Sequence, residues 1–147
     1  MDERQIMNEL HLLLGHVPGA TPLEHRRDGW WMRAPRVDVV AMAGMMRRLG
    51  ARLATMTALA LEAGETAVIY HYVLGPAAVN IRTETRGRSL PSIAPVTRAA
   101  DWIEREVHDL FGVEFLGHPN LVRLIRPAQA PQGLFRTPGG ETSRSQG

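Results

Sequence analysis

The sequence has no cysteine, and this absence removes several kinds of chemistry from a chain of 147 residues. Without thiols the chain cannot form disulfides, build a thiolate zinc site or ligate an iron–sulfur cluster. Lysine is also missing, so all 17 basic side chains are arginine. These arginines are scattered along the sequence, which argues against the basic stripe of a nucleic-acid-binding domain.

The sequence also has no membrane span, no signal-peptide pattern and no common nucleotide-binding or hydrolase motif. Spanning a membrane takes a run of about 18 apolar residues or more, and none occurs. The apolar patch near the N-terminus is interrupted by Asp2, Glu3 and Glu9, unlike the apolar core of a signal peptide. The chain also lacks the G-x-G-x-x-G and G-x-S-x-G motifs, so neither nicotinamide binding nor a hydrolase nucleophile has motif support.

What remains is the composition of one globular domain, with 44% hydrophobic residues and a net charge of +2. Its periodicity predicts an α+β fold, with a small, mainly antiparallel sheet and helices packed on one face. The expected elements are helix 2–14, strand 29–34, helix 37–49, strands 51–61, 67–74 and 78–86, a helix capped by the Thr97 hydroxyl and ended by Gly112, and strand 113–115.

The sequence also predicts how the strands are arranged, what connects the last strand to the following helix, and where the domain ends. Residues 51–61 are mostly apolar on both faces, which is typical of a central strand, and the short spacings to the next two strands favour hairpins. Residues 87–96 hold two prolines and predict a connection without regular structure. We expect residues 1–126 to form the domain and residues 127–147 to form an irregular, disordered tail.

Residues 102–123 combine the most charge and aromatic character, reading W-I-E-R-E-V-H-D-L-F-G-V-E-F-L-G-H-P-N-L-V-R. Arg105 stands four residues from both Asp101 and Asp109, so it can pair with either on a helix. Glu104 and His108 are one turn apart, which fits either an acid–base pair or a surface ion pair. His108, Asp109 and His118 together would make only a weak metal site, because no third histidine accompanies them.

The motif E-R-E-x-H-D-L-F-G-V-x-F-x-G-H-P-x-L-x-R-L resembles the signature of the 30 kDa subunit family of respiratory complex I, also called the C subunit of NADH-quinone oxidoreductase. The module also occurs in related membrane-bound [NiFe] hydrogenases and formate hydrogenlyases. The positions matching this signature or its hydrogenase-type form are Glu104, Arg105, Glu106, His108, Asp109, Phe111, Gly112, Gly117, His118, Pro119 and Arg123.

This resemblance implies a structural subunit without a catalytic residue, metal or bound cofactor of its own. It implies docking, through the signature residues, on the large subunit, which is the 49 kDa subunit-like or hydrogenase large subunit-like chain, beside an iron–sulfur subunit. The partners would carry iron–sulfur clusters with NiFe or, in the quinone reductase, FMN. The complex would lie on the inner face of the cell membrane, with this chain peripheral and cytoplasmic.

Three features favour the hydrogenase-type branch over the quinone reductase. His108 stands where respiratory members usually have tyrosine, and the stretch Tyr70-His71-Tyr72 resembles hydrogenase-type chains. The K-D of the respiratory P-L-R-K-D-like element is also missing after Pro127. The C subunit of the quinone reductase proper remains the alternative. A stand-alone enzyme using Glu104 and His108, or a nucleic-acid-binding domain, are the rivals from other functional classes.

Overall fold

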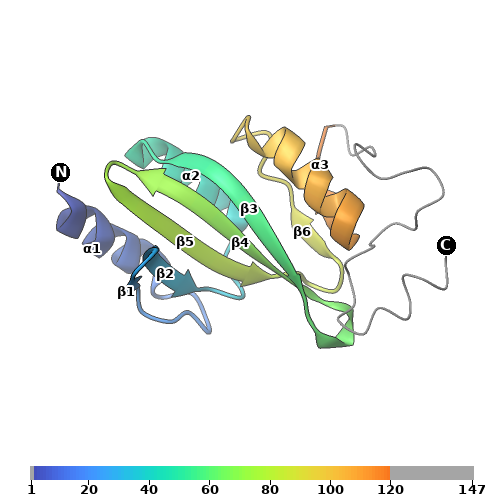
Figure 1. Ribbon diagram of the computed structural model, residues 1–147, viewed down its shortest axis with the longest axis horizontal. Coiled ribbons are helices and arrows are strands. Elements are labelled where there is room, and N and C mark those ends of the chain that lie inside the picture. The colour runs from blue at the N-terminus through green and yellow to red at the C-terminus, as the bar shows by residue number, and fades with distance from the viewer. Residues whose placement is uncertain (1, 120–147) are drawn as a thin grey trace.

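A five-stranded sheet with helices on one face forms the body of the computed structural model, which describes residues 2–119 (Figure 1). The mainly antiparallel α+β fold predicted from the sequence is confirmed, whereas the expected tail 127–147 lies outside the described residues. The elements are α1 (Glu3–Leu14), β1 (Glu24–Arg26), β2 (Gly29–Arg33), α2 (Val39–Leu49), β3 (Arg52–Ala60), η1 (Glu62–Gly64), β4 (Thr66–Leu74), β5 (Ala77–Glu84), β6 (Ser89–Pro91), α3 (Ala100–Phe111) and β7 (Glu114–Leu116).

The strand order is β1-β2-β5-β4-β3, with the predicted hairpins β3–β4 and β4–β5 at one side. Strand β2 joins β5 in parallel, because the chain crosses over through α2 and the hairpins before it returns. The prediction of a central strand at 51–61 is wrong, since β3 is an edge strand. Its register shifts between Leu53 and Thr55, and Thr55, Thr57 and Leu59 are exposed.

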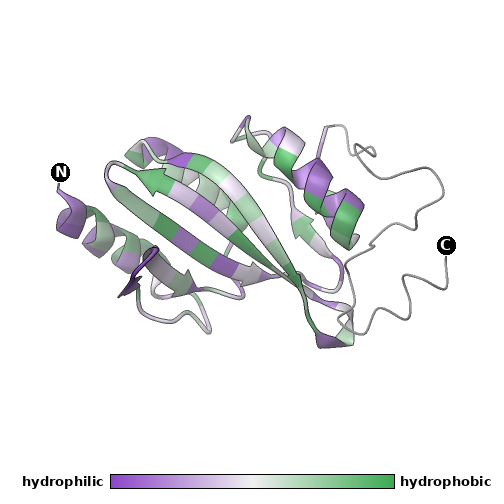
Figure 2. Ribbon diagram, in the orientation of Figure 1, coloured by the Kyte–Doolittle hydropathy of each residue, from purple (hydrophilic) through white to green (hydrophobic). Residues whose placement is uncertain are grey.

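Alternation along β4 and β5 decides which face of the sheet is covered. Tyr70, Tyr72, Val79 and Ile81 are at most 2% exposed, whereas their neighbours on the opposite face are mostly half-buried. Figure 2 shows the corresponding alternation of hydrophobic and hydrophilic residues along these strands. Because successive strand residues point to opposite faces, the helices pack against the tyrosine side and leave the other side open.

Helix α2 is a conventional amphipathic helix with a cap at each end. The Asp38 carboxylate accepts hydrogen bonds from the amides of Val40 and Ala41, both at 3.1 Å. At the other end Gly50 adopts a left-handed conformation (φ 84°), as the sequence predicts. Met42 and Met46, on the predicted apolar face, are 1% and 0% exposed, so this helix contributes aliphatic surface to the core.

Helix α3 corrects two predictions. Its N-cap is Ala99, which makes no side-chain capping bond, so the predicted cap by the Thr97 hydroxyl is wrong. Instead the helix is entered through backbone turns, with the Ala100 amide 3.0 Å from the Thr97 carbonyl. The preceding connection is also more regular than predicted, because residues 89–91 form β6 and pair in parallel with β7. At its C-terminus, Gly112 is left-handed (φ 74°) as expected.

Candidate docking site

Glu104, which the sequence leaves open as a surface residue, lies fully inside the protein. Its side chain is 0% exposed and receives two hydrogen bonds from the segment that follows β6. The Ser92 hydroxyl donates to Oε1 at 2.6 Å, and the Ile93 amide donates to Oε2 at 2.8 Å. Burial raises the pKa of Glu104, and these two hydrogen bonds act in the opposite direction by stabilising the carboxylate.

His118 closes the same cluster from the turn that follows β7. Its buried ring places Nε2 3.0 Å from the Asp101 carbonyl oxygen and 3.9 Å from Oε1 of Glu104. Because a carbonyl oxygen can only accept, Nε2 must carry the proton. The predicted rigid turn at residues 117–119 therefore fastens the chain after β7 to the first turn of α3, helped by left-handed Gly117 (φ 83°).

His108 and Asp109 are buried as well, at 8% and 0% exposure. His108 Nδ1 donates to the Val113 carbonyl at 2.8 Å, which fastens the helix end to the start of β7. An exposed Glu104–His108 ion pair is therefore wrong, and Glu104 is inaccessible to a substrate in this structure. Within residues 2–119, no group of three or more histidine, aspartate or glutamate side chains is placed to hold a metal ion.

The signature residues differ in how far their side chains are buried. We call Glu104, Ser92, His118 and the backbone groups that they bind the buried clamp. The side chains of Glu104, His108, Asp109 and His118 are buried within this chain, and the expectation that the signature residues contact a partner stays a prediction. Arg105 and Glu106 are half-buried, and Phe111 packs partly against the core. Gly117 and Pro119 are exposed, and Arg123 lies outside the described residues.

The two elements that the buried clamp joins, α3 and β7, each carry one large exposed apolar side chain, which the sequence analysis did not single out. Trp102 on α3 is 54% exposed and Leu116 at the end of β7 is 59% exposed. The Arg105 guanidinium lies 5.4 Å from the Trp102 ring centroid, and its Nε is 3.3 Å from Oδ1 of Asp101. The sequence signal was present: Trp102 falls off the apolar face formed by Ala100, Ile103 and Val107.

A second polar arrangement crosses the open face of the sheet. His71 on β4 bonds with Thr57 on β3 at 2.7 Å and with Asn80 on β5 at 2.6 Å. Asn80 in turn donates to the Trp30 carbonyl on β2 at 3.1 Å. The chain of bonds joins four neighbouring strands, so a structural role accounts for the histidine of the Tyr70-His71-Tyr72 stretch.

Comparison with known proteins places residues 32–136 within the family model described as the 30 kDa subunit of respiratory-chain NADH dehydrogenase. The chain belongs to this family. Among curated relatives of the family, the C subunit of NADH-quinone oxidoreductase from Chlorobium phaeobacteroides is 48% identical over 50 residues, which are 34% of this chain and 30% of that protein. The chain matches only 12% and 38% of two further relatives, so it spans a minor part of their lengths.

Two solved structures resemble the whole domain. A trypsin-resistant fragment of Nqo5 superposes with a TM-score of 0.63 and 26% identity, covering 78% of this chain and 99% of the fragment. The membrane-bound sulfane sulfur reductase, an archaeal respiratory membrane complex, gives 0.66 at 22% identity over 89% of this chain and 82% of that one. The second likeness concerns the fold alone. Within residues 2–119, no helix is long and apolar enough to cross a bilayer.

Proposed function

We propose that the chain is a non-catalytic structural subunit of a complex I-related membrane-bound oxidoreductase and docks on its large subunit. The observation that carries the proposal is the exposure of two large apolar side chains, Trp102 on α3 and Leu116 on β7, the two elements that the buried clamp joins. Tryptophan and arginine are enriched where protein interfaces gain most of their binding energy. Family membership supports the class of partner, and the exposure of these two side chains supports a contact through them.

The buried clamp makes the proposed surface rigid before binding. Glu104 ties α3 to the segment after β6, while His118 ties the turn after β7 to Asp101. Trp102 and Leu116 lie on the two elements that these bonds hold together. A surface ordered in advance loses less conformational entropy on binding, which favours affinity.

In this proposal the chain holds no redox group, and electron transfer belongs to the partner chains with their iron–sulfur clusters. The absence of cysteine in the sequence supports this for clusters bound through thiolates. We therefore expect the purified chain to carry no flavin, nicotinamide or iron in stoichiometric amount. Absorption spectra and metal analysis test this, and a stoichiometric chromophore would contradict it.

For the branch of the family, we propose a [NiFe] hydrogenase or formate hydrogenlyase-type complex, on the basis of His108 and the Tyr70-His71-Tyr72 stretch. The alternative is the C subunit of NADH-quinone oxidoreductase proper, and the curated relatives favour this alternative by their names. In either branch the chain would be peripheral on the inner face of the membrane. Mass spectrometry of the captured large subunit separates the two branches.

Affinity capture from detergent-solubilised native membranes tests the docking surface. We expect the tagged full chain to retain the large-subunit-like chain, and the double variant Trp102→Ser/Leu116→Ser to retain at least about tenfold less, because exposed aromatic anchors contribute ~2 kcal/mol or more to an interface. The matched control is Leu12→Ser on α1, where the leucine is 75% exposed.

Thermal unfolding of the same variants separates binding from folding. Because all three side chains are at least half exposed, the unfolding midpoint should stay close to that of the parent chain. Equal capture by the double variant and the parent would contradict docking through this surface. A loss of capture in the Leu12→Ser control as large as in the double variant would show that the effect is not specific to α3 and β7.

A further inference from the structure

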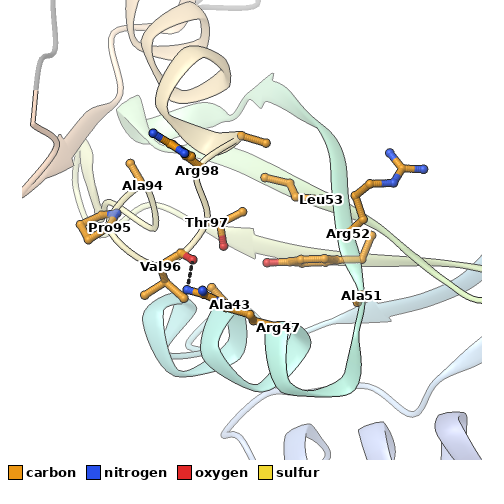
Figure 3. Close-up of a pocket in the computed structure, with 12 residues that line it drawn as sticks. Ala43, Arg47, Ala51, Arg52, Leu53, Ala94, Pro95, Val96, Thr97 and Arg98 are labelled. Carbon is orange, nitrogen blue, oxygen red and sulfur yellow. Dashed lines mark hydrogen bonds between the residues drawn. The ribbon is translucent and has the colours of Figure 1, made fainter.

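A cavity of about 540 Å³ opens between α2, the start of β3 and the loop before α3 (Figure 3). It lies on the helix-covered side of the sheet, because Tyr72 of that face is part of its wall. Its lining residues are Ala43, Arg47, Ala51, Arg52, Leu53, Tyr72, Ala94, Pro95, Val96, Thr97, Arg98 and Ala99. None of these is acidic, and three are arginines.

The hydroxyl of Tyr72, on the cavity wall, has no hydrogen-bond partner in the part of the chain that the structure describes. The residue is only 2% exposed, and its hydroxyl is buried without a hydrogen-bond partner among the described residues. Leaving a buried hydroxyl unsatisfied costs free energy, so such a group on a cavity wall points to a missing partner. Burial and the nearby Glu104 raise the pKa of Tyr72, so the hydroxyl stays protonated and can donate.

The three arginine side chains lie differently relative to the cavity. The Arg47 Nη1 donates to the Val96 carbonyl at 3.2 Å, which fixes the guanidinium at the cavity wall (Figure 3). Arg98 lies in the loop before α3, where its exposed side chain borders the cavity beside Ala94 (Figure 3). In Figure 3 the Arg52 side chain points away from the cavity, so its positive charge can attract an anionic ligand but does not line the bound position. Glu104 lies near Tyr72, but the Tyr72 hydroxyl makes no hydrogen bond to it.

The remaining wall is aliphatic, formed mainly by alanines with Leu53, Pro95 and Val96. A free inorganic anion would leave this part of the wall without contacts. An acidic side chain next to an aliphatic one would satisfy both parts of the cavity. Arginine pairs with carboxylates in a bidentate geometry, and neutral hydroxyl donors add further hydrogen bonds to the same oxygens.

We propose that this cavity receives an acidic, aliphatic segment of a partner polypeptide in the assembled complex. The carboxylate pairs with Arg47 and accepts from the Tyr72 hydroxyl, Arg98 adds positive charge at the rim of the cavity, and the neighbouring aliphatic side chain packs on Leu53 and Val96. The inference rests on the proposed function, because it needs a partner polypeptide. It adds a second contact, placed before α3, to the one assigned to Trp102 and Leu116.

Cross-linking from the cavity tests this inference in the assembled complex. Thr97 lines the cavity, and the chain has no cysteine, so Thr97→Cys would carry its single thiol. A benzophenone maleimide on this thiol should link to a partner segment that contains aspartate or glutamate. The control is Arg48→Cys, an exposed position on α2 that does not line the cavity.

A pair of variants checks the chemistry of the site. Tyr72→Phe combined with Arg98→Gln removes a donor and a charge, and we expect the cross-link yield to fall about tenfold. Arg48→Gln removes an arginine outside the cavity and should leave the yield unchanged. An unchanged yield in the Tyr72→Phe/Arg98→Gln chain would overturn the assignment of these groups.

The outcomes separate this inference from the proposed function. If the large-subunit-like chain is captured but the probe at position 97 links only to lipid, to its own chain or to a segment without acidic residues, the cavity inference is wrong and docking through α3 stands. If no large-subunit-like chain is captured by the parent protein, the proposed function itself fails and the inference fails with it.

Discussion

Helices α2 and α3 cover the same face of the sheet and both end at a left-handed glycine, yet they are fixed by different interactions. The buried residues of α2 are all apolar, and its N-terminus is capped by the Asp38 carboxylate. The buried residues of α3 include Glu104, His108 and Asp109, and its first turn has no side-chain cap. Helix α2 is held by packing, whereas α3 adds hydrogen bonds to loops and strand ends to its apolar packing.

The difference explains where sequence reasoning succeeded. Apolar periodicity predicts α2 and the strands β4 and β5 closely, because their burial follows directly from residue type. It also predicts α3 and Gly112, since Ala100 and Val107 lie on its buried face. A charged residue on a helix is normally solvated, so the same reasoning does not predict that Glu104 is buried.

The burial of Glu104 could not be predicted because the sequence does not show which groups donate hydrogen bonds to its carboxylate. Glu104 is buried because Ser92 and Ile93, from a segment predicted as an irregular connection, supply hydrogen bonds to both of its oxygens. Such a pairing depends on tertiary structure and leaves no local pattern. The edge position of β3 was missed for a similar reason, because the parallel pairing of β2 with β5 depends on a long crossover.

The largest expected effect comes from the packed helix. Met42→Ala in α2 removes a side chain that is 1% exposed, and we expect the free energy of unfolding to fall by about 2–5 kcal/mol through lost packing. Denaturant unfolding measures the change, which should be independent of pH. A loss well below this range would indicate that the core around α2 relaxes to fill the space.

The buried clamp gives a different pattern. Glu104→Ala leaves the Ser92 hydroxyl and the Ile93 amide without their acceptor, and we expect a loss of about 2–4 kcal/mol. Glu104→Gln keeps one acceptor oxygen and the shape, so its loss should be smaller. Equal losses for alanine and glutamine in denaturant unfolding would show that acceptor oxygens are not what holds this part of the fold.

The pH dependence tests the state of the same carboxyl group. Its pKa is raised in the folded protein above the ordinary value of 4.5, so the folded state binds this proton more tightly than the unfolded state does. The stability of the parent chain should therefore fall, relative to Glu104→Gln, as pH rises from about 4.5 through the folded pKa. A rise instead would mean that the hydrogen bonds from Ser92 and Ile93 outweigh burial.

The helix ends provide the smallest effects. Asp38→Ala removes the carboxylate that caps α2, and we expect a loss of about 0.5–2 kcal/mol in the free energy of unfolding. Thr97→Ala should cost less than about 0.5 kcal/mol, since its hydroxyl does not cap α3. If denaturant unfolding shows equal losses for the two variants, Thr97 acts as a cap after all.

A cryo-electron microscopy map of the assembled complex would show directly whether this chain docks through Trp102 and Leu116. We predict that Trp102 and Leu116 lie against the large-subunit-like chain, while the Glu104 carboxylate still receives its bonds from Ser92 and Ile93 within this chain. A map with Trp102 and Leu116 facing solvent, or with Glu104 turned outward onto the partner, would contradict it.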